Sequence, residues 1–243
     1  MNVFLAQVQS EPGHVAANVG RHVAALSALA PDPGDLVAFP ELSLSNYDPT
    51  AAVTAAVAPD DDRLAPLQRA ADDAGCVVVV GAPLRTAGRP CIAALVFTAG
   101  RGPLVVGKRH LHPDEHTHFS PYEGEVGVLD LARRVGLAIC FEVSVPGHAA
   151  AAARAGVEVY LASAAKTADG VTAAQASLAE TSRRHALPAL LVNSVGTCEG
   201  KEAGGRSFAL DASGRLLGQL GGSDEGALVY DAERQAVAAR LLR

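Results

Sequence analysis

Midway along the chain stands the stretch Val135-Gly136-Leu137-Ala138-Ile139-Cys140-Phe141-Glu142, and Pro146 follows shortly after it. Its first five residues are apolar without interruption, which is typical of a β-strand covered on both faces. The apolar run stops at Cys140, and Pro146 favours the start of a helix. We therefore expect the Cys140 side chain at the carboxyl edge of a sheet, where open α/β sheets bind ligands.

Working outward from this stretch, apolar runs and helical patterns alternate along most of the chain. Further strands are predicted near residues 3–8, 36–39, 76–80, 92–97, 157–162 and 189–195, and helices near 15–29, 63–73, 147–155 and 172–187. Beyond residue 206 the pattern changes to hairpin-like strands. The alternation predicts an α/β layered fold. No linker-like stretch interrupts it, so we expect a single domain over residues 1–243.

Composition excludes several classes of function. The 243 residues are 49% hydrophobic, which is enough for a substantial core, and the net charge of -6 offers no basic surface for nucleic acid. No apolar run approaches the roughly 20 residues that a membrane-spanning helix needs, so no membrane partner is expected. The first residues lack a basic leader, and we expect a cytoplasmic protein.

Two positions have the setting of catalytic residues. Cys140 ends a strand and precedes a turn, which suits a nucleophile, although a buried cysteine that serves as a small apolar residue fits the position equally. In Phe39-Pro40-Glu41-Leu42-Ser43, a lone acid follows a buried strand. Desolvation there would raise the pKa of the Glu41 carboxyl group and suit it to accept a proton, whereas an ordinary loop glutamate is the alternative. The other cysteines lack such a setting; they are Cys76, Cys91 and Cys198.

Residues Gly102–Lys108 match the spacing G-x-x-x-x-G-K, with which a phosphate-binding loop begins. Arg109 stands where the metal-coordinating Ser or Thr is needed, and the spacer is strand-like rather than a loop of small residues. We therefore reject nucleotide binding. Lys108 remains either a surface lysine or a cation that points into a site.

A dense polar cluster follows Lys108 and consists of His110, His112, Asp114, Glu115, His116 and His118. The cluster lacks the helical i, i+4 histidine pair with a distant third ligand that is typical of zinc enzymes. We expect neither a metal nor any other cofactor. These side chains are predicted to line the rim of a site.

Taken together, Glu41, Lys108 and Cys140 resemble the Glu-Lys-Cys triad of the nitrilase superfamily of carbon-nitrogen hydrolases. The similarity extends over nearly the whole chain. The matching motifs are Phe39-Pro40-Glu41-Leu42, Gly107-Lys108-Arg109-His110-Leu111, Gly136-Leu137-Ala138-Ile139-Cys140-Phe141-Glu142, Asn193 with Gly196, and Gly205-Arg206-Ser207. Three catalytic motifs in the family's order are far more specific than any one of them.

The resemblance implies a four-layer α-β-β-α sandwich, with two β-sheets inside and helices outside. It also implies a homodimer or higher homo-oligomer in which helices near the nucleophile pack together. Many members carry a second glutamate after the lysine, and Glu115 occupies that place, with Glu123 as a fallback. One departure is that Ser163-Ala164-Ala165-Lys166 lacks the bulky residue often found after that strand.

The activity implied by the resemblance is hydrolysis of a small-molecule amide to a carboxylic acid and ammonia through a thioester on Cys140. An ω-amidase-like substrate is favoured because Lys166 is suited to meet a substrate carboxylate. Phe141, Glu142, Ser163, Ala164 and Lys166 are the expected oxyanion and substrate-binding residues. The alternatives are a nitrilase or an N-carbamoyl hydrolase with the same triad, an acyltransferase, or an interaction protein that keeps the fold without activity.

Overall fold

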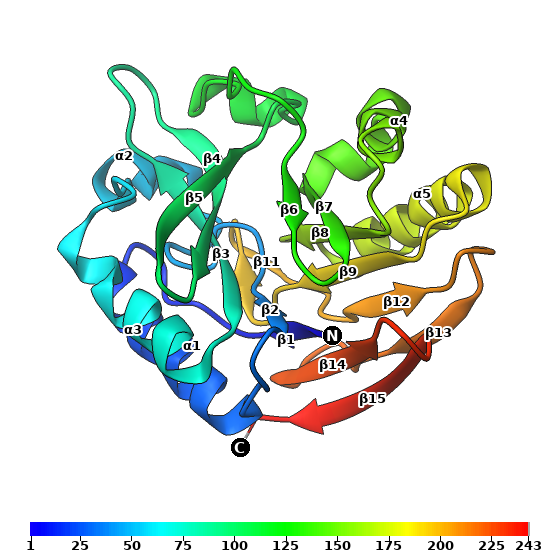
Figure 1. Cartoon of the computed structure of the whole chain (residues 1–243). Coiled ribbons are helices and arrows are strands. Elements are labelled where there is room, and N and C mark those ends of the chain that lie inside the picture. The colour runs from blue at the N-terminus through cyan, green and yellow to red at the C-terminus, as the bar shows by residue number, and fades with distance from the viewer. Residues whose placement is uncertain (243) are drawn as a thin grey trace.

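The computed structural model describes residues 1–242 as two β-sheets packed face to face, with helices on the outer faces (Figure 1). The first sheet has the strand order β15-β14-β1-β2-β3-β4-β5. Its strands are β1 (Asn2–Gln7), β2 (Leu36–Ala38), β3 (Val77–Leu84), β4 (Cys91–Thr98), β5 (Arg101–Gly107), β14 (Gly226–Asp231) and β15 (Ala236–Leu241). Within this sheet β1, β2 and β3 run parallel, and the outer strands are antiparallel.

The second sheet has the order β13-β12-β9-β8-β7-β6. Its strands are β6 (Val128–Asp130), β7 (Arg134–Ile139), β8 (Val159–Ala164), β9 (Ala189–Asn193), β12 (Phe208–Leu210) and β13 (Leu216–Gln219). Strands β7, β8 and β9 are parallel, so each sheet has a parallel centre. A small separate hairpin is formed by β10 (Thr197–Cys198) and β11 (Lys201–Glu202).

Helices cover the two outer faces. In Figure 1, α1 and α3 lie beside the first sheet, and α4 and α5 lie beside the second. The helices are α1 (Val15–Leu29), α2 (Ala52–Ala55), α3 (Ala65–Ala74), α4 (Pro146–Arg154) and α5 (Ala168–His185); the 3₁₀ turns are η1 (Pro49–Ala51), η2 (Asp62–Leu64), η3 (Pro113–Thr117) and η4 (Cys140–Ser144). The result is the predicted α-β-β-α sandwich.

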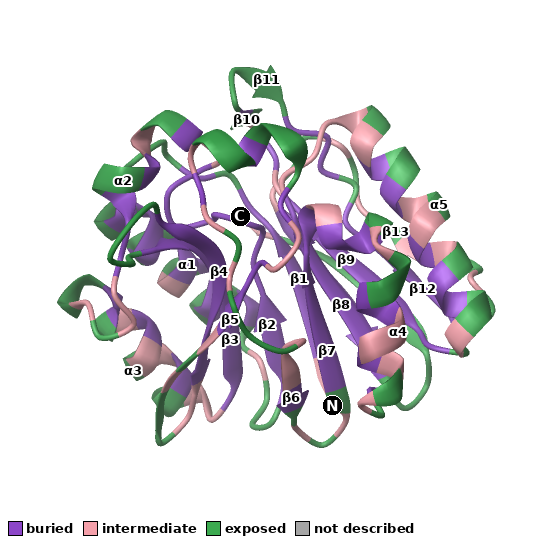
Figure 2. Ribbon diagram, turned by 90° about the horizontal axis from the view of Figure 1, so that it is seen from above, coloured by how far each residue is buried: buried purple, intermediate pink, exposed green. Residues whose placement is uncertain are grey.

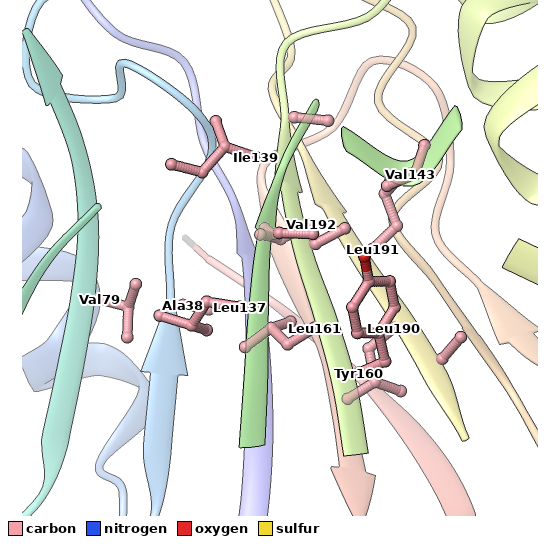
Figure 3. Packing of buried hydrophobic residues seen from close by; sticks show 14 of the residues in the cluster. Ala38, Val79, Leu137, Ile139, Val143, Tyr160, Leu161, Leu190, Leu191 and Val192 are labelled. Carbon is pink, nitrogen blue, oxygen red and sulfur yellow. The ribbon is translucent and has the colours of Figure 1, made fainter. Parts of the chain in front are cut away.

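Alternation along the strands explains why two layers of core form. Val3 and Leu5 of β1 belong to the core shared with the second sheet, whereas Phe4 and Ala6 pack with α1 and α3. In a strand, successive side chains point to opposite faces, so one apolar run supplies both layers. Figure 2 shows the central strands buried along their length, and Figure 3 shows Ala38 and Val79 of the first sheet near Leu137 of the second.

The C-terminal strands form antiparallel hairpins, as predicted, but the two hairpins belong to different sheets. Strands β12 and β13 extend the second sheet, whereas β14 and β15 extend the first. The chain after residue 206 therefore joins both layers of the sandwich. Strand β15 is largely exposed, and the sequence analysis did not predict it.

Candidate active site

Glu41 lies in the turn that follows β2, and its side chain is fully buried. Lys108 Nζ donates a hydrogen bond to Glu41 Oε1 at 2.7 Å, while Oε2 has no partner within residues 1–242. The turn packs tightly on β3, where a Cβ added to Gly81 would lie 2.2 Å from the backbone nitrogen of Leu42. Glycine at position 81 therefore allows the base loop to sit against the sheet.

Lys108 directly follows β5 and is completely buried. Its ammonium group lies between two carboxylates, 2.7 Å from Glu41 Oε1 and 2.6 Å from Glu115 Oε1. The backbone N–H of Lys108 donates to the carbonyl of Ile92 on β4, which fixes the residue at the end of the edge strand. A buried ammonium group is stable only with such ionic partners, so the three side chains form one unit.

Glu115 lies in η3 and is 1% exposed. Its Oε2 accepts a hydrogen bond from the backbone N–H of His112 at 2.7 Å, which anchors the turn. Its Oε1 accepts from the Tyr47 hydroxyl at 2.7 Å, besides the contact with Lys108. The fallback candidate Glu123 is exposed. Glu115 is therefore the second glutamate that contacts the lysine.

Cys140 is the first residue of η4, directly after β7, and is 8% exposed. Its φ angle is 48°, in the left-handed region that non-glycine residues rarely adopt. This bend is the turn that the abrupt end of the apolar run predicts. The Cys140 thiol lies close enough to Glu41 and Lys108 for each to change its pKa. The structure therefore brings the three triad residues together from two different sheets.

Burial and charge set the protonation of these groups. Desolvation raises the pKa of Glu41, and Lys108 opposes the rise. Desolvation and the nearby Glu41 carboxylate raise the pKa of the Cys140 thiol to about 11. Burial opposes the charge of Lys108, but the carboxylates of Glu41 and Glu115 outweigh it and raise the pKa of the lysine. The resting site therefore holds an ammonium group and an un-ionised thiol.

The expected substrate-binding residues lie at the ends of β7 and β8. Ser163 and Ala164 form the end of β8 and are buried, and Phe141 follows Cys140 with its ring edge-on to His112 at 5.3 Å. The Lys166 backbone is held on both sides by the Asn193 side-chain amide, which accepts from its N–H at 2.8 Å and donates to its carbonyl at 3.0 Å.

The side chain of Lys166 is half-buried, and its charge acts to lower the pKa of Cys140. No ion pair links it to another residue within the described part of the chain. Lys166 is therefore, in addition to Lys108, a second cation whose charge acts on the Cys140 sulfur.

A cavity of about 300 Å³ opens over Tyr47. It lies between the turn at residues 46–50 and the β10–β11 hairpin, and its lining includes His118 and Glu199. Tyr47 also contacts Glu115, so the ring separates this cavity from the buried carboxylates.

Comparison with known sequences decides the family. Residues 3–240 match the sequence profile described as carbon-nitrogen hydrolase. The chain belongs to the carbon-nitrogen hydrolase family. It is also 30% identical over 223 residues to an (R)-stereoselective amidase from a Pseudomonas species, and the match covers 91% of this chain and 81% of that protein.

Solved structures agree with this carbon-nitrogen hydrolase assignment. An amidase from Nesterenkonia sp. aligns with a TM-score of 0.83 at 26% identity, over 94% of this chain and 89% of that one. A variant of the Nesterenkonia sp. AN1 amidase, described as carrying acrylamide added to its active-site cysteine, aligns with a TM-score of 0.83 at 25% identity, over 95% and 92%. The amidase-like nitrilase-superfamily assignment, the fold and the enzyme class predicted from the sequence are confirmed.

One residue of the carbon-nitrogen hydrolase site was missed by the sequence analysis. Tyr47 contacts Glu115, although the two are 68 residues apart. A weak signal existed, because Tyr47 is one of only four tyrosines and follows the base motif closely.

The histidine cluster after Lys108 has no arrangement suited to a metal ion. Within residues 1–242, no group of three or more His, Cys, Asp or Glu side chains could hold one.

Proposed function

We propose that residues 1–243 form a single carbon-nitrogen hydrolase domain that cleaves a small-molecule amide to a carboxylic acid and ammonia at Cys140. The main support is the position of Lys108, whose buried ammonium group lies between Glu41 and Glu115 beside the thiol. Such an array supplies a base, a cation and a nucleophile within one desolvated site. The amidases among the relatives favour an amide as the substrate.

In the first half of the reaction, Glu41 accepts the thiol proton of Cys140 and the sulfur attacks the amide carbonyl carbon. The unpartnered Glu41 Oε2 and the raised pKa of the thiol support a proton transfer coupled to the attack. The carbonyl oxygen becomes an oxyanion, which accepts hydrogen bonds from the Lys108 ammonium group and the Phe141 N–H. Losing one such donor typically costs about 2.7–4 kcal/mol of transition-state stabilisation.

In the second half, protonated Glu41 donates its proton to the leaving nitrogen, the C–N bond breaks and ammonia departs. The acyl group remains on Cys140 as a thioester. Glu41 then takes a proton from water, whose oxygen attacks the thioester carbonyl, and the proton returns to the sulfur as the acid leaves. Glu115 keeps Lys108 charged and in place through both halves.

The substrate class that the site favours is an ω-amide, which carries a carboxylate at the far end. Lys166 supports this choice, because its ammonium group is near Cys140 and makes no ion pair within residues 1–242. A substrate carboxylate would supply the missing partner. Because Asn193 holds the Lys166 backbone by two hydrogen bonds, the contact between Lys166 and the substrate carboxylate would form at a fixed position.

The chemistry is tested by trapping the acyl enzyme. With a panel of amides, wild-type protein quenched in acid is expected to gain the mass of the acyl group on the peptide that contains Cys140. The variant Cys140→Ser, which keeps the size of the side chain, is expected to lose at least about 10³-fold in kcat. Full activity in that variant, or turnover without any adduct, would contradict the mechanism.

The substrate class is tested with two amides of similar length, the monoamide of a C4 or C5 dicarboxylic acid and neutral butyramide. Replacing Lys166 by Met is expected to raise KM for the acidic amide by about tenfold or more and to leave butyramide unchanged. The exposed Lys201 provides the matched control, Lys201→Met. Equal effects on both amides, or a preference of the wild type for nitriles or N-carbamoyl compounds, would overturn the ω-amide choice.

We also infer a homodimer that associates through α4 and α5 and a cytoplasmic location. Helices α4 and α5 flank the nucleophile turn and cover the outer face of the second sheet. Across residues 1–242, no helix has the length and apolar character to cross a membrane. Light scattering of the purified protein would decide the oligomeric state, with a monomeric mass counting against the dimer.

A further inference from the structure

Glu142 is a buried acid that the proposed mechanism does not use. It is 2% exposed, and both of its carboxylate oxygens have partners. Oε1 accepts hydrogen bonds from the backbone N–H groups of Arg109 at 2.8 Å and His110 at 3.2 Å. Oε2 accepts from the backbone N–H of Ile139 at 2.9 Å and lies 3.4 Å from His148 Nε2.

These backbone partners flank the catalytic residues. Arg109 and His110 directly follow Lys108, and Ile139 directly precedes Cys140. The lysine loop leaves β5 of the first sheet, whereas the nucleophile turn leaves β7 of the second. One carboxylate therefore joins two loops that otherwise belong to different layers of the sandwich.

The nucleophile turn needs such support. Cys140 has a φ angle of 48°, and a residue in this region keeps its conformation only where the surroundings hold it. Glu142 accepts the N–H of Ile139 within the first turn of η4, as an acid does in a capping box. The same side chain thus holds the strained turn and sets its distance from the lysine loop.

His148 and Tyr160 orient the carboxylate. His148 is 3% exposed, and its Nδ1 lies 2.7 Å from the Tyr160 hydroxyl. Because Nε2 faces a carboxylate, which can only accept, a neutral His148 carries its proton on Nε2, and its Nδ1 then accepts a hydrogen bond from the Tyr160 phenol. Desolvation lowers the pKa of His148, although Glu142 opposes the shift, while His110 and Arg109 add to it. A neutral histidine thus directs its Nε2 toward the carboxylate at 3.4 Å without cancelling the carboxylate charge.

We propose that Glu142 is a positioning residue that fixes the separation of Lys108 and Cys140, with His148 and Tyr160 orienting its carboxylate. This inference rests on the proposed function, since it assigns a purpose to the spacing of the same two catalytic groups. It also revises the sequence-based expectation that Glu142 binds substrate. Both of its oxygens are already occupied by protein donors.

The decisive variant is Glu142→Gln, which keeps the shape of the side chain but replaces one acceptor oxygen with an NH₂ donor that would face N–H groups. We expect kcat to fall about 10²-fold with KM within about threefold, because a small misplacement of catalytic groups slows the reaction without removing a substrate contact. The pH dependence of Cys140 alkylation by iodoacetamide is expected to shift as well, since Lys108 acts on the thiol.

The matched control is Glu158→Gln. Glu158 also accepts a backbone N–H, that of Arg134 at 3.0 Å, but at the opposite end of β7 and on the surface. We expect its kcat and its alkylation profile to match the wild type. Should Glu142→Gln fail to fold, Tyr160→Phe is the second variant, with an expected fall in kcat of about three- to tenfold and an unchanged KM.

Three outcomes would overturn the proposal: an unchanged kcat in Glu142→Gln, an equal loss in Glu158→Gln, or a rise in KM without a fall in kcat, which indicates substrate contact. The alkylation profile needs no turnover, so it separates this inference from the proposed function. A wild type that hydrolyses no amide refutes the function alone. A wild type that hydrolyses amides, beside a Glu142→Gln variant with an unaltered alkylation profile, refutes the positioning role.

Discussion

The base and the nucleophile occupy equivalent places in the two sheets but are held by different forces. Glu41 follows the parallel strand β2 and Cys140 follows the parallel strand β7. Each turn contains a residue with positive φ, Leu42 at 51° on one side and Cys140 at 48° on the other. Glu41 is fixed by a buried charge, whereas the Cys140 turn is fixed by backbone hydrogen bonds to Glu142.

The difference fits the roles that the two residues have in the proposed mechanism. Glu41 exchanges a proton, so one oxygen is tied to Lys108 and Oε2 is left without a partner in the described chain. Cys140 would form and break a covalent bond, so its position matters most, and the Ile139 N–H that donates to Glu142 fixes the turn that carries it. An ion pair with Lys108 thus holds Glu41, whereas a hydrogen bond from the Ile139 N–H to Glu142 holds the Cys140 turn.

A buried histidine contacts each of these two segments, and the two histidines differ in their hydrogen-bond partners. His22 on α1 stacks on Phe39 with ring centroids 4.1 Å apart, and its Nε2 has no partner within residues 1–242. His148 has partners on both ring nitrogens, Tyr160 and Glu142. Acid should therefore disturb the base side of the site more than the nucleophile side.

The largest expected effect comes from removing the proton carrier. Glu41→Gln keeps the shape of the side chain, and Lys108 keeps Glu115 as its partner, so the fold should persist. Without the base, kcat/KM is expected to fall about 10³-fold. Steady-state assays with the preferred amide measure this. The exposed Glu202 gives the control Glu202→Gln. A loss smaller than tenfold would mean that another group takes the thiol proton.

The next largest predicted effect is a loss of folding stability in acid, which His22 causes. Burial lowers the pKa of His22 from 6.5 to about 4. Between these values the unfolded chain binds a proton that the folded chain does not, so stability is complete above about pH 6.5 and declines as the pH falls toward 4. The difference corresponds to about 3 kcal/mol. Urea unfolding at pH 7.5 and pH 4 should show a smaller decline for His22→Gln than for the wild type.

The control for this comparison is His14→Gln, because His14 is exposed at the N-cap of the same helix, α1. Its decline in stability between the two pH values should equal that of the wild type. An identical decline in His22→Gln would show that acid acts elsewhere in the molecule.

The smallest predicted effect on activity comes from removing the Tyr47 hydroxyl, which contacts Glu115. Tyr47→Phe removes the hydroxyl that donates to Glu115 Oε1 at 2.7 Å. Losing one hydrogen bond to a charged group should lower kcat about tenfold, with the fold intact. Tyr122→Phe is the control, because the Tyr122 ring packs on Gly107 and its hydroxyl makes no hydrogen bond to Glu115 within residues 1–242. Equal activity in both variants would show that Lys108 and the His112 N–H hold Glu115 without Tyr47.

Several elements were predictable because their signal is local. The apolar runs before Glu41, Lys108 and Cys140 each end at or within a few residues of the proposed catalytic residue, and a strand's end can be read from its own sequence. Helix α4 begins at Pro146, as the proline indicates. Strand β15 escaped prediction, because three of its six residues are alanine, which favours helices over strands.

The chain's local pattern thus determined which residues end strands and which segments form helices, and the resemblance of three motifs to the nitrilase superfamily indicated the Glu-Lys-Cys triad. Only the tertiary structure decided that Tyr47 and Lys108 share Glu115 and that Glu142 ties together loops from two sheets. The physical reason is that strand and helix patterns arise from neighbours along the chain. Hydrogen bonds between loops arise from how two separately formed sheets pack, and no spacing in the sequence encodes that distance.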